Sequence, residues 1–190
     1  MSVIPVPDPP LSDGVVTLRR FEPHDAATIA DACSDPLIPR FTFMADDLTP
    51  EKAMEWIGRR AEQWRTGQVA GFAIVGTVDQ RRLIGTIGLG INQSFVTGEV
   101  FYWVAARERR RGVATRSVQL ISEWAFERLA LERLELLTHT DNVASRAGAE
   151  ACGYTYEGTL RSHRPFKEGR MDSALFSLLP GEQGRVTQDR

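Results

Sequence analysis

Short links join a series of strand-like segments in the middle of the chain. The segments are rich in β-branched, aromatic and aliphatic residues, and they cover residues 69–79, 83–92 and 98–104. Consecutive strands with links this short pair antiparallel, because a parallel pair needs a crossover of about a dozen residues or more. The sequence therefore predicts an antiparallel meander, which constrains the fold more than any other feature.

Helical and strand-like patterns alternate around this meander. Thr49 can cap a helix that has Pro50 at its first position and Gly67 after its end. An amphipathic helix is expected at residues 114–129, shorter helices at 23–33 and 142–152, and further strands at 15–19, 133–140, 154–160 and 171–179. These elements predict an α+β fold in which helices flank a mixed, mostly antiparallel sheet.

The length and charge of the chain bound its organisation. At 190 residues it is expected to form one domain over residues 15–179, between an extended Pro-rich arm at 1–14 and a polar tail at 180–190. Its 23 basic and 25 acidic residues give a net charge of -2. No global positive field would therefore draw the protein to nucleic acid.

Cysteine content and hydropathy predict a cytoplasmic protein. Cys33 and Cys152 are too few for a disulfide framework or a cysteine zinc site. The first residues lack the pattern of a signal peptide, and no run approaches the ~18 apolar residues of a membrane span. Because the histidines show no paired metal-ligand spacing, we expect neither a metal nor a membrane contact.

The link after the meander indicates a ligand site. An apolar strand runs through the Arg-rich residues 107–111 into the next helix. A helix start offers unpaired N–H groups and the positive end of its dipole. In Arg109-x-x-Gly112-x-Ala114, two small residues would let a phosphate approach the backbone. These features indicate an anion site, and the alternatives are a solvated basic loop or a nucleic-acid-binding patch at residues 107–116.

This segment resembles the pyrophosphate-binding loop of the GNAT N-acetyltransferases. Asn142-x-x-Ser145 and Glu150-x-x-Gly153-Tyr154 are similar to a run in the branch that includes RimJ and RimL, which acetylates protein N-terminal amines. The resemblance covers about residues 15–179. It implies a splay between the third meander strand and the strand at 133–140, which admits the pantetheine arm of acetyl-CoA.

The resemblance implies acetyl-CoA as the co-substrate. Backbone N–H groups of the loop would bind its pyrophosphate, and Asn142 would bind the pantetheine arm, although Asn142 is also an ordinary helix N-cap. The expected cofactor-binding residues are Val104, Arg109, Arg110, Arg111, Gly112, Val113, Ala114, Thr115, Asn142 and Ser145.

Acetyl transfer needs a neutral amine and a stabilised leaving thiolate. An α-amine is already neutral in roughly a tenth of molecules at pH 7, so a weak base or a water chain suffices. The resemblance places Ser145 near the cofactor sulfur, where its hydroxyl would donate a hydrogen bond to the thiolate. It places Glu99 where it could order water against the amine. The alternative for both is an ordinary surface residue.

Two positions depart from the family pattern. Phe101 replaces the usual glycine, shares a strand face with Glu99 and Trp103, and is expected with Trp103 to line the acceptor side. Gly148 lies within the helix at 142–152, where glycine costs ~1 kcal/mol relative to alanine, so close packing is expected there. The basic residues of 161–170 are expected to be solvated surface.

These residues predict an enzyme in which a primary amine attacks the thioester directly, with no covalent enzyme intermediate. The expected acceptor is a protein or peptide N-terminal α-amine. The alternatives are a small-molecule amine (an antibiotic, polyamine or amino acid) and a non-catalytic acyl-CoA sensor. An acidic groove would favour a polyamine or an aminoglycoside. The expected assembly is a monomer or a homodimer.

Overall fold

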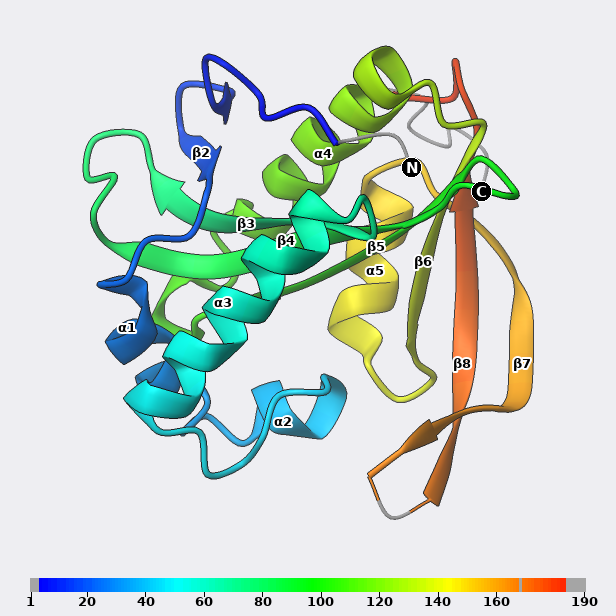
Figure 1. Ribbon diagram of the computed structural model, residues 1–190. Coiled ribbons are helices and arrows are strands. Elements are labelled where there is room, and N and C mark those ends of the chain that lie inside the picture. Colours follow the sequence, from blue (N-terminus) through cyan, green and yellow to red (C-terminus); the bar gives the residue numbers. More distant parts are fainter. Residues whose placement is uncertain (1–3, 168, 184–190) are drawn as a thin grey trace.

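A single sheet of eight strands organises the computed structural model, which describes residues 4–167 and 169–183 (Figure 1). The strand order is β1-β2-β3-β4-β5-β6-β8-β7, and among these strands only β5 and β6 pair in parallel. The strands are β1 (Leu11–Ser12), β2 (Val16–Arg19), β3 (Val69–Gly76), β4 (Leu83–Asn92), β5 (Thr97–Val104), β6 (Arg133–His139), β7 (Thr155–Phe166) and β8 (Gly169–Leu178). The predicted α+β fold with a mixed, mostly antiparallel sheet is confirmed.

Helices cover both faces of this sheet (Figure 1). Successive residues of β3 alternate between two cores, as the two-residue period of a strand requires. Ala73 and Val75 pack in the core that contains α1 and α3, whereas Phe72 and Ile74 pack in the core that contains α4. The helices are α1 (Asp25–Ala32), α2 (Leu37–Phe41), α3 (Pro50–Arg65), the 3-10 turn η1 (Ala106–Glu108), α4 (Val113–Leu129) and α5 (Val143–Ala151).

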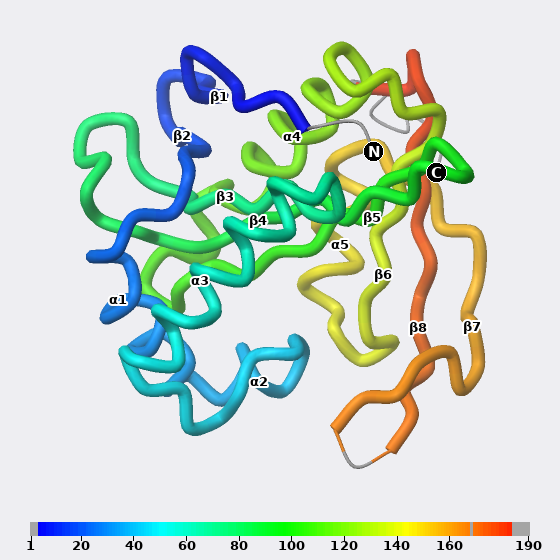
Figure 2. The backbone as a smooth tube through the Cα atoms, in the orientation of Figure 1, coloured from blue at the N-terminus to red at the C-terminus, as the bar shows by residue number. Residues whose placement is uncertain are grey.

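The strands β5 and β6 separate partway along their length. Their parallel register runs from Thr97 opposite Arg133 to Val100 opposite Leu136 and ends there. Beyond this point β5 stays paired with β4 as far as Val104, and β6 stays paired with β8 as far as His139. Figure 2 shows the resulting divergence, with β3, β4 and β5 running across the view while β6 and β8 run down it. The predicted splay is confirmed.

The N-terminal arm and the segment before α3 differ from the sequence-based expectation. Asp13 accepts hydrogen bonds from the backbone N–H groups of Val15 and Val16, and the turn lets β1 pair with β2. The prediction of an arm without an element is therefore wrong at Leu11–Ser12. The first helix ends at Ala32, and Pro36 serves as the N-cap of α2, which the sequence did not predict. Residues 184–190 of the predicted tail lie outside the described residues.

Candidate active site

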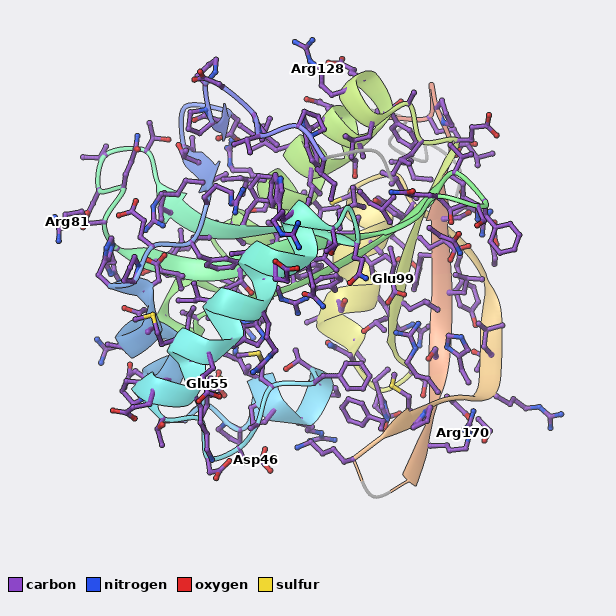
Figure 3. The ribbon with its side chains drawn as sticks, viewed as in Figure 1. Asp46, Glu55, Arg81, Glu99, Arg128 and Arg170 are labelled. Atoms are coloured by element: carbon purple, nitrogen blue, oxygen red, sulfur yellow. The ribbon has the colours of Figure 1, made fainter. Side chains whose placement is uncertain are left out.

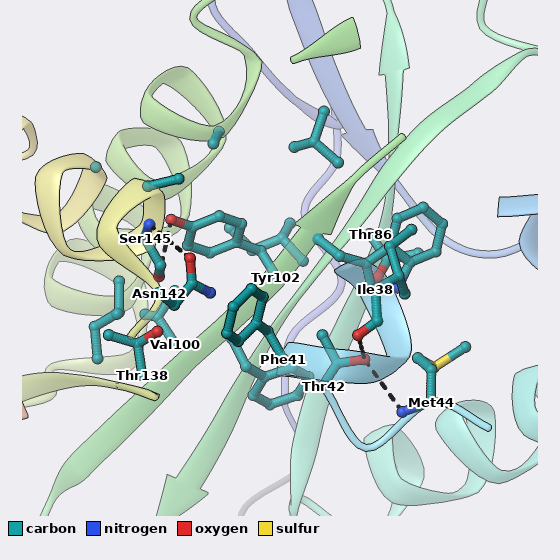
Figure 4. A pocket seen from close by; sticks show the side chains of 18 of the residues that line it. Ile38, Phe41, Thr42, Met44, Thr86, Val100, Tyr102, Thr138, Asn142 and Ser145 are labelled. Carbon is teal, nitrogen blue, oxygen red and sulfur yellow. Dashed lines mark hydrogen bonds between the residues drawn. The ribbon is translucent and has the colours of Figure 1, made fainter. Parts of the chain in front are cut away.

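A cleft with a volume of about 1130 Å³ follows the splay and continues to both sides of it. Figure 4 shows side chains from β5 and α5 on one side of the cleft, and side chains of α2 and the residues after it on the other. All the predicted site residues except Arg111 line this cleft. We call the part formed by the α4 start and α5 the cofactor half, and the part formed by α2, α3 and the end of β7 the acceptor half.

The cofactor half is built around the start of α4. Gly112 is the N-cap residue and has a φ of 75°, in the left-handed region that favours glycine. Within the described residues no side chain caps this helix, so its first N–H groups remain available to a ligand. The dipole of a helix of this length adds positive potential at the same place. The site therefore fits a pyrophosphate, as the loop pattern predicts.

The arginines of the loop do not have equal freedom to bind an anion. Arg109 donates to the carbonyl of Val104 at 3.1 Å and pairs with Asp35. Arg111 pairs with Glu108 and is the one predicted site residue that does not line the cleft, so its place in the cofactor site stays a prediction. Arg110 is exposed, lines the cleft and has no ion-pair partner in the described part of the chain. Arg110 is thus the arginine best placed to meet a phosphate.

Asn142 and Ser145 lie together at the start of α5, on the β6 side of the splay. The Asn142 side chain accepts a hydrogen bond from the backbone N–H of Ser145 at 3.1 Å, so its N-cap role is confirmed. The Ser145 hydroxyl lies 3.4 Å from the hydroxyl of Tyr102, which reaches across from β5 (Figure 4). Burial raises the pKa of Tyr102, so the phenol stays protonated at neutral pH. The sequence analysis did not identify Tyr102.

Gly148 explains how Tyr102 fits against α5. A Cβ atom at Gly148 would lie 3.1 Å from the Tyr102 hydroxyl oxygen, closer than most Cβ contacts. The helical glycine therefore makes room for the phenol, and the expected close packing at this position is confirmed. Gly148 and the partly buried Tyr102 therefore pack against each other beside Ser145.

Glu99 belongs to an ion pair in the acceptor half. Both of its carboxylate oxygens accept from the guanidinium of Arg164 on β7, at 3.0 and 3.2 Å. Figure 3 places Glu99 between α3 and β8, near the centre of that view. Arg164 lines the cleft, so the expectation that residues 161–170 are solvated surface is wrong at this residue. Glu99 and Arg164 are too far apart in the sequence for their pairing to be predicted from local patterns.

Phe101 lines the acceptor half of the cleft. Its ring lies over Gly88, where an added Cβ would approach a ring atom to 2.4 Å. Phe101 and Trp103 both line the cleft, and Trp103 is 6% exposed. Arg60 of α3 places its guanidinium carbon 5.1 Å from the centre of the Phe101 ring. The acceptor half thus combines aromatic walls with an additional cation that the sequence analysis did not identify.

The structure shows neither a metal group nor a membrane helix in the residues it describes. No cluster of three or more His, Cys, Asp and Glu side chains there could hold a metal ion. No helix in the same residues is long and apolar enough to cross a membrane. His139, which lines the cleft, accepts from the backbone N–H of Asp141 at 3.2 Å, so its ring supports the turn between β6 and α5.

The splayed sheet and its cleft are those of an N-acetyltransferase. The family model of the GNAT acetyltransferase domain matches residues 16–155, and the chain belongs to this family. A relative from Bacillus licheniformis, the uncharacterized N-acetyltransferase p20, is 27% identical over 168 residues, which are 88% of this chain and 94% of that protein.

Solved structures share the fold over most of the chain. Mycobacterium smegmatis RimJ, in complex with CoA-disulfide, has a TM-score of 0.80 at 21% identity and covers 89% of this chain and 84% of its own. The ribosomal-protein-S5-alanine acetyltransferase from Vibrio fischeri has a TM-score of 0.74 at 21% identity, covering 88% and 94%. These similarities show that the fold is shared with both proteins.

Proposed function

We propose that the protein transfers the acetyl group of acetyl-CoA to the N-terminal α-amine of a protein or peptide. The charge of the acceptor half is the observation that supports an α-amine as the acceptor. Glu99 is neutralised by Arg164, and Arg60 adds a positive charge. A polycationic amine such as a polyamine or an aminoglycoside would be repelled by this balance, whereas a peptide end brings one amine and a neutral backbone.

The cofactor half provides the groups that acetyl-CoA requires. The N–H groups of the α4 start and the Arg110 side chain would hold the pyrophosphate, and the unpaired edges of β5 and β6 would hold the pantetheine arm. Bound acetyl-CoA supplies an activated thioester. This fit to acetyl-CoA is supported by two features that face the same cleft, the uncapped start of α4 and the splay between β5 and β6.

Ser145 is proposed as the hydrogen-bond donor to the departing sulfur. Tyr102 would act as its positioning residue, with the phenol donating to Ser145 Oγ so that the serine proton is directed toward the sulfur. Because a thiol has a pKa near 8.5, the thiolate needs only this stabilisation and not full protonation before it departs. The role of Tyr102 as a donor is supported by the burial that keeps it protonated.

Glu99 is proposed to order a water molecule against the acceptor amine. Its carboxylate is held in place by Arg164, and its oxygens keep lone pairs that can accept a hydrogen bond from water. A carboxylate that acts through a water molecule suffices to take the proton of an α-amine, which has a pKa near 8. It does not suffice for a lysine, which has a pKa near 10.4. The ion pair therefore supports the α-amine over the lysine side chain as the acceptor.

Release of free thiol from acetyl-CoA tests this function. One reaction contains pooled peptides with different N-termini, and the other contains pooled polyamines, aminoglycosides and amino acids. We expect release with the peptides. Release with small amines alone would replace the proposed acceptor and keep the enzyme class. Acetyl-CoA binding without release in either reaction would favour a sensor.

A further inference from the structure

Arg60 presents a cation to the acceptor half without a carboxylate to neutralise it. Its aliphatic stem packs on Gly71 of β3, where an added Cβ would lie 3.5 Å from Arg60 Cδ. Its guanidinium carbon lies 4.9 Å from the centre of the Trp56 ring and 5.1 Å from that of Phe101. The side chain is therefore held over the sheet, with its head directed into the cleft that it lines.

The hydrogen bonds of Arg60 leave most of its donors free. One Nη1 proton is donated to Gln63 Oε1 at 2.9 Å, and a guanidinium has five such protons. Within residues 4–167 and 169–183, Arg60 forms no ion pair, and the nearby carboxylate of Glu99 is bound on both oxygens by Arg164. Aromatic faces stabilise a cation but do not neutralise it or accept its remaining N–H groups.

Burial makes this arrangement costly when the cleft is empty. It lowers the pKa of the guanidinium, yet an arginine keeps its proton in proteins. A partly buried cation with no ion-pair partner among the described residues is stabilised by an anion that a ligand brings. Arg60 lines the same cleft as Phe101 and as Glu99, which is proposed to order water against the amine, so such an anion would lie in the half of the cleft that takes the acceptor.

We propose that Arg60 binds a carboxylate of the amine acceptor, so that the enzyme prefers acceptors with a negative charge close to the α-amine. An acidic side chain near a peptide N-terminus and the carboxylate of a free amino acid carry the same chemistry. The proposal rests on the proposed function and names the acceptor more narrowly. The guanidinium lies against the rings of Phe101 and Trp56, and its free N–H groups can donate two parallel hydrogen bonds to a carboxylate.

Matched peptides test the preference. They are identical except for Asp or Asn, or Glu or Gln, at the second residue, and kcat/KM is measured by thiol release with saturating acetyl-CoA. The wild type is expected to prefer the acidic peptides by about tenfold, as for one charge-assisted contact. Free aspartate and glutamate, compared with asparagine and glutamine, form the second arm and distinguish a side-chain carboxylate of a peptide from a free amino acid.

Variants of neighbouring arginines assign the preference to one side chain. Arg60→Met keeps the apolar stem and is expected to abolish the preference, whereas Arg60→Lys keeps part of it through its point charge. Arg59→Met is the control, because Arg59 is exposed on the same helix and pairs with Glu55. Thermal melting establishes that each variant is folded.

Equilibrium binding keeps this proposal separate from the catalytic one. The same peptides are titrated calorimetrically into the wild type and Arg60→Met in the presence of CoA. Tighter binding of the acidic member, lost in Arg60→Met, would support the proposal even if no peptide were acetylated. Equal binding and equal kcat/KM for acidic and amide peptides in the wild type would overturn it, as would a preference that persists in Arg60→Met.

Discussion

The cofactor half and the acceptor half of the cleft are built from different kinds of groups. In the cofactor half, the groups proposed to bind the co-substrate are mainly backbone N–H groups of consecutive residues at the start of α4, where Gly112 takes a left-handed conformation. In the acceptor half, side chains from α3, β5 and β7 meet only in the folded protein, as Arg60, Glu99 and Arg164 do.

Because of this difference, substitutions can change the acceptor half more easily than the cofactor half. Backbone groups recognise a pyrophosphate whatever the neighbouring side chains are, so that half suits a co-substrate shared by a whole family. Side chains that meet across the sheet can change one at a time without disturbing the loop. We therefore expect substitutions in the two halves to affect different kinetic constants.

The largest expected effect lies at Ser145, where the halves meet. Ser145→Ala removes the hydrogen-bond donor proposed for the departing sulfur, and kcat should fall by about 100-fold, as for one donor that acts in the transition state. The KM for acetyl-CoA should change little, which steady-state kinetics will show. Ser145→Thr keeps a hydroxyl and should restore part of the activity. A loss of less than about threefold in Ser145→Ala would remove Ser145 from the mechanism.

The next effect tests the cofactor half alone. Gly112→Val places a β-branched residue at a φ of 75°, and the strain of about 2 kcal/mol should raise the KM for acetyl-CoA by about thirtyfold. The preference among peptides should stay as it is in the wild type. Gly58→Ala, at an exposed helical glycine with open space around it, is the control and should leave the KM unchanged. An unchanged KM in Gly112→Val would show that the loop does not bind the co-substrate.

Glu99 tests the acceptor half through pH. Glu99→Gln should lower kcat/KM for a peptide by about tenfold at pH 7, since roughly nine-tenths of the α-amine must lose a proton. By pH 9 most of the amine is neutral, so the variant should approach the wild type. Rate measurements across this range are compared with Glu135→Gln, a carboxylate opposite Glu99 on β6 that does not line the cleft. If kcat/KM of Glu99→Gln were still tenfold lower at pH 9, Glu99 would not assist the deprotonation of the amine.

The smallest effect concerns the contact between Tyr102 and Gly148. Alanine in place of a helical glycine stabilises by ~1 kcal/mol where space allows. In the wild type, the crowding of a Cβ against the Tyr102 hydroxyl at 3.1 Å should cancel part of that gain. In the Tyr102→Phe background, Gly148→Ala should show the full gain in the free energy of unfolding by urea. Equal gains in both backgrounds would show that the phenol does not occupy this space.

The cofactor half could be predicted from the sequence because its elements are local. The meander, the link and the helix start follow one another between residues 69 and 129, and each has its own turn, cap or periodic pattern. The splay came from the family resemblance, and the register of β5 and β6 confirms it. The pairing of Arg111 with Glu108 could not be predicted, because a charge pattern does not tell which arginines are already paired with acids.

The acceptor half could not be predicted in the same way. Glu99 and Arg164 are 65 residues apart, and nothing in either local pattern indicates their pairing. Tyr102 could have been found, because strand alternation turns it to the face opposite Phe101, and a glycine within the helix at 142–152 leaves room for a large side chain. Arg60 lies on a helix whose pattern shows only an amphipathic face, so its place over Phe101 required the tertiary structure.

The position of the acetyl group on a product tests the central claim most directly. A peptide with a free N-terminus and one internal lysine is incubated with the protein and acetyl-CoA, and tandem mass spectrometry locates the modification. The ion-paired Glu99 and the cationic acceptor half predict acetylation of the α-amine. Acetylation of the lysine instead, or of small amines with no modification of the peptide, would contradict the account.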